Sequence, residues 1–324
     1  MCTAATYSNG GFYFGRNLDY EFSYGESVTV TPREFVFDLR HLPKQSAHFA
    51  FIGMAHVRDG YPLYYDAMNE KGLCVAGLNF VGNARYFPAR EGKVNVAQFE
   101  LIPWLMSSFE SVSQVRAAAE QLNITDEPFC DGLPTAQLHW LIADKDDCVV
   151  LESTYDGVHI YDNPAGVLTN NPPFPVQMSQ LNNYMALSPR SPQNSFAPDI
   201  PLTQLSRGMG AIGLPGDLSS QSRFVRAAFV RSNSRSEREE SKNVTQFFHI
   251  LTSVEQQRGC CEVAPDKYEI TIYSSCCSAD SGCYYYTTYD RRAITAVSLK
   301  RADLDSDRLT SYPLRSGEVI GFEN

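Results

Sequence analysis

The sequence of 324 residues lacks the apolar run of roughly 18 or more residues that a transmembrane helix needs. It is also short of positive charge, with 27 Lys and Arg against 37 Asp and Glu and a formal net charge of −10. A surface that binds nucleic-acid phosphates requires the opposite sign. We therefore expect neither nucleic acid nor a membrane as a partner. The first residues have no basic segment followed by an apolar one, so no signal peptide is predicted and a cytoplasmic protein is expected.

The common metal and nucleotide motifs are missing too. No two of the six histidines lie four residues apart, and no cysteine pair has the C-x-x-C spacing, so we expect neither a metal nor another cofactor. There is no G-x-S-x-G and no Walker A motif. Residues 208–213 match G-x-G-x-x-G, but they lie between a proline-containing loop and a turn. A dinucleotide site needs a strand before this motif and a helix after it, so none is predicted.

The nine cysteines are an odd number, and they include two directly adjacent pairs, Cys260-Cys261 and Cys276-Cys277. A secreted disulfide framework usually has an even number of spaced cysteines. Reduced thiols in a cytosolic protein fit this pattern better.

The pattern of turns and apolar residues predicts strands at both ends of the chain and helices between them. An Asn-Gly turn at residues 9–10 indicates a hairpin. Strands are predicted over residues 3–7, 11–15, 67–80 (two strands), 138–144, 148–154, 157–161, 268–273, 284–289 and 295–299. Helices are predicted over residues 96–109, 111–122, 222–231 and 243–254. Since no linker or repeat is visible, we expect one α+β domain over residues 1–324.

Cys2 is the residue whose position most suggests chemistry. The initiator Met is generally removed when a small residue follows, and loss of Met1 would leave a thiol and a free α-amine on Cys2. With a reference pKa of about 7.7–8.0, an α-amine can accept the thiol proton near neutral pH. Such a nucleophile needs no catalytic histidine. The alternative is that Cys2 is only the first residue of a strand.

Arg16 and Asp19 lie just after the second strand of the predicted hairpin, which could bring them close to the thiol. A guanidinium would favour thiolate over thiol, and a carboxylate could orient the α-ammonium. The alternative is a surface ion pair between the two side chains, which would matter little.

Asn79 and Asn170 each stand at the end of a predicted strand. An amide at such a place can donate a hydrogen bond to a developing oxyanion. The segment that contains Asn170, Thr169-Asn170-Asn171-Pro172, is equally typical of an ordinary turn.

Several segments occur in an order that is specific in combination: Met1–Thr3, Gly15–Asp19, Gly77–Phe80, Leu168–Pro172, and Gly213–Asp217 followed by Ser222–Phe229. Together they resemble the choloylglycine hydrolase family, which contains bile salt hydrolases and penicillin V acylases. The resemblance spans nearly the whole chain. It implies an N-terminal nucleophile hydrolase fold, an αββα sandwich of two antiparallel sheets between layers of helices.

The resemblance also implies roles for individual residues. Cys2 corresponds to the nucleophile freed by loss of Met1, Arg16 to the arginine beside the thiolate, and Asp19 to the carboxylate that holds the α-amine. Those positions all match the family in residue type.

Further roles follow from the same resemblance. Asn170 corresponds to the oxyanion donor that uses its side-chain amide, and Asn79 to the position whose backbone N–H completes the oxyanion hole. Arg223 corresponds to a buried arginine that organises the pocket. Leu18 falls where the family places an apolar residue against the acyl group.

The function implied is hydrolysis of glycine- and taurine-conjugated bile salts by a cysteine amidase. Asn79 favours bile salts, because many penicillin V acylases carry Tyr at that position. Residues 20–24, 58–64 and 129–138 are expected to supply further apolar wall. Penicillin V acylase or another N-acyl amidase activity is the alternative, and a non-catalytic steroid-binding protein is a third. Family members are often tetramers, so a homotetramer is expected by analogy.

Overall fold

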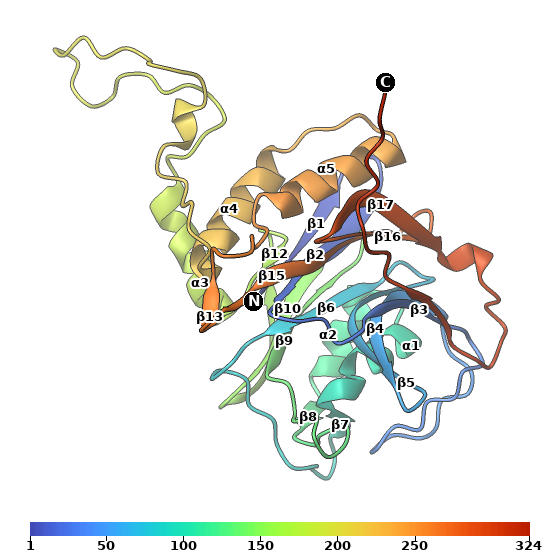
Figure 1. Ribbon diagram of the computed structural model, residues 1–324. Helices are drawn as coiled ribbons and strands as arrows, with labels where there is room; N and C mark the ends of the chain where they lie inside the picture. The colour runs from blue at the N-terminus through green and yellow to red at the C-terminus, as the bar shows by residue number, and fades with distance from the viewer.

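Two large antiparallel sheets form the centre of the structure, a computed structural model that describes residues 1–324 (Figure 1). The first sheet contains, in spatial order, β12 (Val167–Leu168), β1 (Cys2–Ser8), β2 (Phe12–Tyr20), β15 (Ile270–Ser278), β16 (Cys283–Thr288) and β17 (Arg291–Ser298). The second contains β11 (Gly157–Asp162), β10 (Cys148–Thr154), β9 (Leu138–Ala143), β6 (Cys74–Asn79), β5 (Tyr61–Asn69), β4 (Phe51–Arg58), β3 (Ser27–Thr31) and β18 (Thr310–Pro313).

Helices cover the outer face of each sheet (Figure 1). The helices on the side of the first sheet are α3 (Phe174–Gln180), α4 (Ser220–Asn233) and α5 (Glu240–Thr252). Those over the second are α1 (Leu101–Ser108) and α2 (Val112–Ala119). The layers therefore follow the order helix, sheet, sheet, helix, so the expected α+β class and αββα layering are confirmed.

Short elements complete the chain. Two small two-stranded sheets pair β7 (Val94–Ala97) with β8 (Leu122–Thr125), and β13 (Glu262–Ala264) with β14 (Lys267–Tyr268). The 3-10 helices are η1 (Gln98–Glu100), η2 (Leu181–Tyr184), η3 (Met209–Ala211) and η4 (Leu299–Arg301).

Buried apolar side chains explain why these layers stay together. In α5, Val244, Phe247, Phe248 and Leu251 recur at three- and four-residue spacing and are buried, so one face of the helix packs on the first sheet. A core of 38 buried residues includes side chains of both sheets together with α4 and α5. A second core of 22 buried residues joins the second sheet to α1 and α2.

The hairpin formed by β1 and β2 determines where the chain places its first residues. Its register pairs Cys2 with Leu18 and Ala4 with Arg16. Directly opposed residues share a face of a sheet and side chains alternate along a strand. Cys2, Leu18 and Arg16 therefore lie on one face of the first sheet, and Asp19 lies on the other.

Some predicted boundaries are wrong. The segment Gly15–Asp19, expected after the second strand, lies within β2, which continues to Tyr20. A methyl group on Gly15 would collide with the backbone carbonyl of Ser275, so the glycine allows β15 to pair closely here.

The first two predicted helices are longer than the observed ones, the first at its N-terminal end and the second at its C-terminal end. The one expected over 96–109 begins at Leu101, and the one expected over 111–122 ends at Ala119. Of the misassigned residues, Val96, Ala97 and Leu122 belong to β7 and β8, which pair in parallel and are rich in β-branched side chains, and residues 98–100 form η1. β3 and β4 were not predicted.

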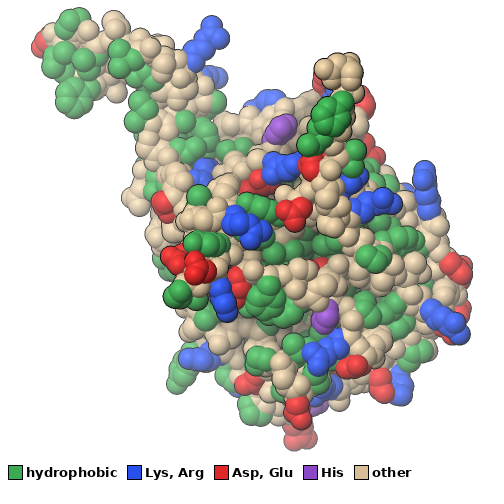
Figure 2. Space-filling model, viewed as in Figure 1, with side chains coloured by type: hydrophobic (Ala, Val, Ile, Leu, Met, Phe, Trp, Pro, Cys, Tyr) green, Lys and Arg blue, Asp and Glu red, His purple; other side chains and the backbone are tan.

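A long segment between η2 and α4 extends away from the body of the molecule (Figure 1). Its two ends meet where the Ser188 N–H donates to the Gly210 carbonyl oxygen at 2.9 Å. We call residues 189–209 the arm. Hydrophobic side chains gather on its surface (Figure 2), among them Phe196 and Leu205, which are exposed. Among the helices, none has both the length and the apolar character needed to span a membrane.

Candidate active site

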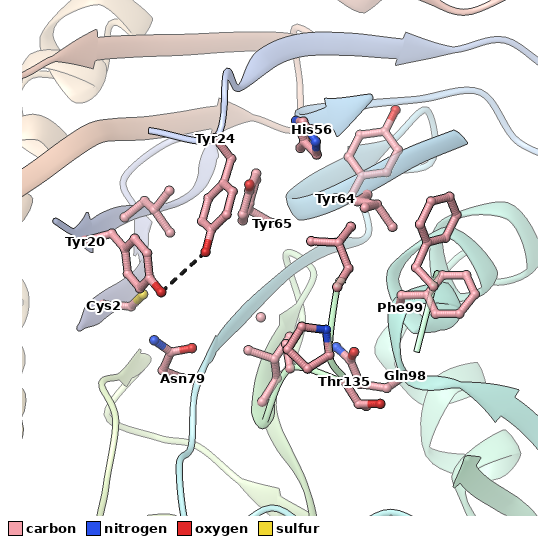
Figure 3. Close-up of a pocket in the computed structure, with 18 of the residues that line it drawn as sticks. Cys2, Tyr20, Tyr24, His56, Tyr64, Tyr65, Asn79, Gln98, Phe99 and Thr135 are labelled. Atoms are coloured by element: carbon pink, nitrogen blue, oxygen red, sulfur yellow. Dashed lines mark hydrogen bonds between the residues drawn. The ribbon is translucent and has the colours of Figure 1, made fainter. Parts of the chain in front are cut away.

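Cys2 lines a pocket of about 420 Å³ between the two sheets. Of its 21 lining residues, 13 are hydrophobic, so the cavity suits a mainly apolar ligand. The wall comes from β2, β5, β6, η1 and the segment before β9. In Figure 3, Cys2, Tyr20 and Asn79 stand toward one side of the pocket, and Gln98 and Phe99 toward the other.

Arg16, which also lines the pocket, contacts the Cys2 thiol. Its fully buried guanidinium donates from Nη2 to Cys2 Sγ at 2.6 Å. Nη1 donates to the carbonyl oxygens of Tyr65, at 3.1 Å, and Gly77, which belong to neighbouring strands of the second sheet. Burial opposes the guanidinium charge, but acidic neighbours, among them Cys2 and Asp66, raise the pKa of Arg16. The contact stabilises negative charge on the sulfur.

Asp66 in β5 supplies a buried negative charge near Arg16, and sequence reasoning missed it. Its carboxylate accepts hydrogen bonds from the hydroxyls of Tyr273 (2.7 Å), Ser275 (2.8 Å) and Tyr284 (2.8 Å). Burial raises the pKa of Asp66, and Arg16 and these hydroxyls oppose that shift. No sequence motif marks Asp66, because its partners lie 207 to 218 residues later in the chain.

Asn170 lies two residues after β12 and contacts the start of the chain. Its Oδ1 accepts hydrogen bonds from the Cys2 backbone N–H at 2.9 Å and from Arg223 Nη2 at 2.7 Å. Its Nδ2 donates to the Asn79 carbonyl oxygen at 2.8 Å. A side-chain amide carries two N–H donors. One donor therefore orients Asn170, and the second remains for a ligand.

Arg223 in α4 ties that helix to the first strand. The side chain is fully buried, and Nη1 donates to Thr3 Oγ1 at 2.6 Å and to the Cys2 carbonyl oxygen. Nε donates to the Leu218 carbonyl oxygen at 3.0 Å. Burial lowers the pKa of Arg223, and the Asp19 carboxylate partly offsets this effect. These contacts fix both Asn170 and the backbone on either side of the thiol.

The backbone N–H of Asn79 is directed away from the neighbouring strand β9. The next residue, Phe80, donates its N–H to the Gln137 carbonyl oxygen of the neighbouring chain segment. Because hydrogen-bonded pairs alternate in an antiparallel ladder, Asn79 faces Leu138 as a non-bonded pair. Its N–H is directed toward β5, whose pairing with β6 ends at Ala76. The donor is therefore available to a ligand.

Met1 is joined to the Cys2 nitrogen that was expected to be the α-amine, and that nitrogen donates to Asn170 Oδ1. Its α-ammonium donates to the Asp19 carbonyl oxygen at 2.7 Å and forms an ion pair with Glu269, and burial lowers its pKa. The Asp19 side chain is buried, with Oδ1 accepting from Thr271 Oγ1 at 2.6 Å and Oδ2 without a partner. The expected pairing of α-amine and Asp19 carboxylate is thus not made while Met1 is present.

A buried pair supports the strand end that carries Asn170, and nothing in the sequence pointed to it. His139 and Glu152 are both fully buried, with Nδ1 of the ring 3.0 Å from Glu152 Oε1. Nε2 lies 2.9 Å from the carbonyl oxygen of Thr169, the residue before Asn170. The Phe80 ring stacks on the imidazole at 4.3 Å. The imidazole therefore links the Glu152 carboxylate to the strand end that carries Asn170.

The structure brings the residues singled out in the sequence to one place: Cys2, Arg16, Leu18, Asp19, Asn79, Asn170 and Arg223. The alternative surface ion pair of Arg16 with Asp19 is wrong, because both residues are fully buried and lie on opposite faces of β2. The three expected wall segments all contribute lining side chains: Tyr20, Tyr24, Leu63, Tyr64, Phe129, Leu133, Pro134, Thr135, Ala136 and Leu138.

Comparison with known proteins identifies the family. The sequence profile of linear amide C–N hydrolases of the choloylglycine hydrolase family matches residues 2–312. This chain belongs to that family. It is a hydrolase of linear amide bonds, and the resemblance seen in the sequence is confirmed.

Relatives within the family carry more specific names. The bile salt hydrolase/transferase of Lactiplantibacillus plantarum is 57% identical over 316 residues, which is 98% of each chain. That of Clostridium perfringens is 36% identical over 329 residues, the whole of both chains.

Solved structures agree with the fold. The C2A mutant of the conjugated bile acid hydrolase from Clostridium perfringens matches with a TM-score of 0.93 and 34% identity over all of both chains. Penicillin V acylase from Agrobacterium tumefaciens matches with a TM-score of 0.76 over 97% of this chain and 92% of that one. At 18% identity, the second match shows the shared fold alone.

Blocking the start of the chain tests whether the α-amine takes part in the reaction. A lysine inserted between Met1 and Cys2 should abolish amide hydrolysis, because Met is not removed before a large residue and the Cys2 amine stays in a peptide bond. Intact mass and hydrolysis rate should be measured on the same preparation.

A matched control carries an N-terminal tag whose protease cleavage releases Cys2 as the first residue. Activity should appear only after cleavage. Full activity in the lysine-inserted protein would show that the nucleophile uses a different base, as a Cys-His dyad does.

Proposed function

We propose that this chain hydrolyses the amide bond of glycine- and taurine-conjugated bile salts with Cys2 as the nucleophile. The observation that supports this most is a largely apolar pocket of about 420 Å³ that has Cys2 and Arg16 in its wall. A conjugated bile salt is a rigid apolar body ending in a secondary amide, and it suits such a cavity. The named bile salt hydrolase relatives support the same substrate class.

The proposed reaction begins with removal of Met1. The new α-amine of Cys2, in its neutral form, lies beside Asp19 Oδ2, the buried acceptor that has no partner beforehand. This amine accepts the thiol proton and becomes an ammonium that pairs with Asp19, and Arg16 stabilises the thiolate through the contact of Nη2 with Sγ. The sulfur attacks the amide carbonyl carbon and forms a C–S bond, which moves an electron pair onto the carbonyl oxygen.

The oxyanion is stabilised by two donors, the second N–H of Asn170 Nδ2 and the backbone N–H of Asn79. The tetrahedral intermediate collapses with cleavage of the C–N bond, and the α-ammonium gives its proton to the leaving amine of glycine or taurine. Water then gives a proton to the neutral α-amine and attacks the thioester carbonyl carbon. The C–S bond breaks, the free bile acid is released, and the ammonium returns its proton to the sulfur. Arg223 acts by positioning Asn170 and the Cys2 backbone.

Truncating the amide tests the oxyanion assignment. Asn170→Ala should lower kcat by on the order of 10²–10³, the usual loss for one donor. KM should change much less, because the interaction strengthens mainly in the transition state. Steady-state kinetics with a conjugated bile salt gives both constants. Unchanged kcat with a raised KM would make Asn170 a residue that binds substrate in the ground state.

Penicillin V is the alternative substrate, since the same thiol and oxyanion hole can attack its amide. Discrimination between bile salts and penicillin V then depends on burial of the acyl group. This burial contributes roughly 25 cal/mol of binding free energy per Å² of apolar area. A steroid nucleus offers more rigid apolar area than a phenoxyacetyl group. With Asn79 rather than Tyr beside the thiol, the pocket wall is also less bulky near the scissile bond.

Substrate comparison tests this choice. We expect kcat/KM at least about tenfold higher for conjugated bile salts than for penicillin V, a barrier difference of roughly 1.4 kcal/mol. Rates for the glycine conjugate, the taurine conjugate and penicillin V should be measured with one preparation. Faster turnover of penicillin V than of both conjugates would overturn the substrate assignment and leave the cysteine amidase intact.

We also propose a cellular compartment, a domain organisation and an oligomeric state for the enzyme. All nine cysteines are unpaired, as a reducing cytoplasm would keep them. The site combines Cys2 with Arg223 from the far part of the chain, which favours one catalytic domain over residues 1–324. Assembly into a homotetramer is favoured by the arm, because exposed apolar side chains such as Phe196 and Leu205 are commonly covered by a partner.

Removing the arm tests the assembly. The intact protein should have a mass in solution of four times the chain's 36.2 kDa, as measured by light scattering after gel filtration. Replacing residues 190–208 by a short Gly-Ser linker should reduce this mass, because Ser188 and Gly210 are already in contact and the body need not change. A variant of unchanged mass would exclude the arm as the oligomer contact.

A further inference from the structure

Some polar side chains that line the pocket already have hydrogen-bond partners within the protein, and others have none. The Tyr20 and Tyr24 hydroxyls hydrogen-bond to each other at 3.4 Å (Figure 3). The Tyr64 hydroxyl makes a hydrogen bond with Thr31 Oγ1 at 2.8 Å and donates to the Thr29 carbonyl oxygen at 3.2 Å. Each of these hydroxyls already has at least one hydrogen-bond partner within the protein.

Gln98 is different. It is the first residue of η1, only 7% of it is exposed, and it lines the pocket (Figure 3). Its side-chain amide makes no hydrogen bond to the protein, although nearly the whole residue is buried. The amide atoms are not among the fully enclosed unpaired polar atoms, so they open onto the cavity. A ligand that fills the pocket will cover this amide.

Covering the amide with an apolar group would be unfavourable. A buried donor or acceptor that loses water without gaining a partner pays its desolvation penalty in full. A site with such a group discriminates strongly in favour of ligands that present a hydroxyl to it. The pocket is thus matched to an apolar body that carries a polar group at the level of Gln98.

The position of Gln98 indicates which part of a substrate it meets. The neighbouring Phe99 ring packs against Tyr61, at the start of β5, with 5.7 Å between ring centroids. Tyr65, four residues along the same strand, is held by Arg16 beneath the thiol. Those four residues of strand span about 13 Å. Gln98 therefore faces the body of a bound substrate rather than its scissile amide.

We propose that Gln98 selects among hydroxylated steroid nuclei, by hydrogen bonding through its side-chain amide to a ring hydroxyl that the trihydroxy conjugate carries and the monohydroxy conjugate lacks. This inference rests on the proposed bile salt hydrolase function and narrows its substrate class. An amide both donates and accepts, so it suits a hydroxyl group, which does the same. The role is one of binding and specificity, because the group lies away from the reacting atoms.

The test compares glycine-conjugated bile salts that bear three, two or one ring hydroxyls, including both common dihydroxy isomers. In Gln98→Met the amide is replaced by an unbranched apolar chain of similar size. We expect kcat/KM for the trihydroxy conjugate to fall about tenfold relative to that for the monohydroxy conjugate. The dihydroxy isomer that retains the selected hydroxyl should fall with the trihydroxy one, which identifies the position on the ring.

Thr135→Val is the matched control, because Thr135 also lines the pocket and its hydroxyl makes no hydrogen bond to the protein. It should leave the ratio unchanged. Turnover of the monohydroxy conjugate shows that Gln98→Met is folded and active. A Gln98→Met ratio equal to wild type, or a loss confined to Thr135→Val, would overturn the inference and leave the proposed function standing. Failure of the wild-type enzyme to hydrolyse any conjugate would overturn both.

Should Gln98→Met be insoluble, the wild-type enzyme alone still decides. A monohydroxy conjugate that is turned over as well as the trihydroxy one, at equal kcat/KM, would contradict selection by ring hydroxyls. A preference of about tenfold for the trihydroxy conjugate over the monohydroxy one would support it.

Discussion

The buried positive charge of Arg16 is the constraint on which the centre of the molecule depends. A guanidinium without access to water is stable only beside negative charge and hydrogen-bond acceptors. Here Cys2 Sγ, the carbonyl oxygens of the second sheet and the carboxylate of Asp66 surround it. Because these groups come from both sheets, the charge fixes how the sheets face each other. The contact of Arg16 with the Cys2 sulfur therefore belongs to the same set of interactions that holds the layers of the fold in place.

The alternation of strands then distributes the rest of the chemistry. Cys2 and Leu18 lie opposite each other in the hairpin, with Arg16 two residues further along the same face. That face carries the nucleophile and the apolar contact, whereas Asp19 on the other face is hydrogen-bonded to Thr271 of β15. A shift of the hairpin by one residue would exchange the two sets. The close approach of Gly15 to the Ser275 backbone opposes such a shift.

Sequence reasoning recovered what local patterns and ordered motifs contain. The Asn-Gly turn predicted the hairpin, and the segments around Cys2, Asn79 and Asn170 indicated the site. Asp66 was missed because its partners, more than 200 residues later in the chain, come close only where the two sheets pack together. His139 and Glu152 lie on the consecutive strands β9 and β10, but no motif marks the pair. Val96, Ala97 and Leu122 were assigned to helices because the strand conformation of β7 and β8 depends on their pairing with each other. The geometry around Met1 also needed coordinates, since its ion pair with Glu269 has no local signal.

The groups that surround Cys2 are already in place in the chain that retains Met1. Arg16, Asn170 and Arg223 already surround Cys2, and Asn170 Oδ1 holds the very nitrogen that becomes the α-amine. Asp19 keeps one buried carboxylate oxygen without a partner, an arrangement that is costly unless a cation is later placed beside it. Loss of Met1 would supply that cation by creating a new ammonium group on Cys2. In the proposed mechanism, the same event would relieve the unfavourable burial of Asp19 and create the amine that accepts the thiol proton, so activation would be coupled to local stabilisation.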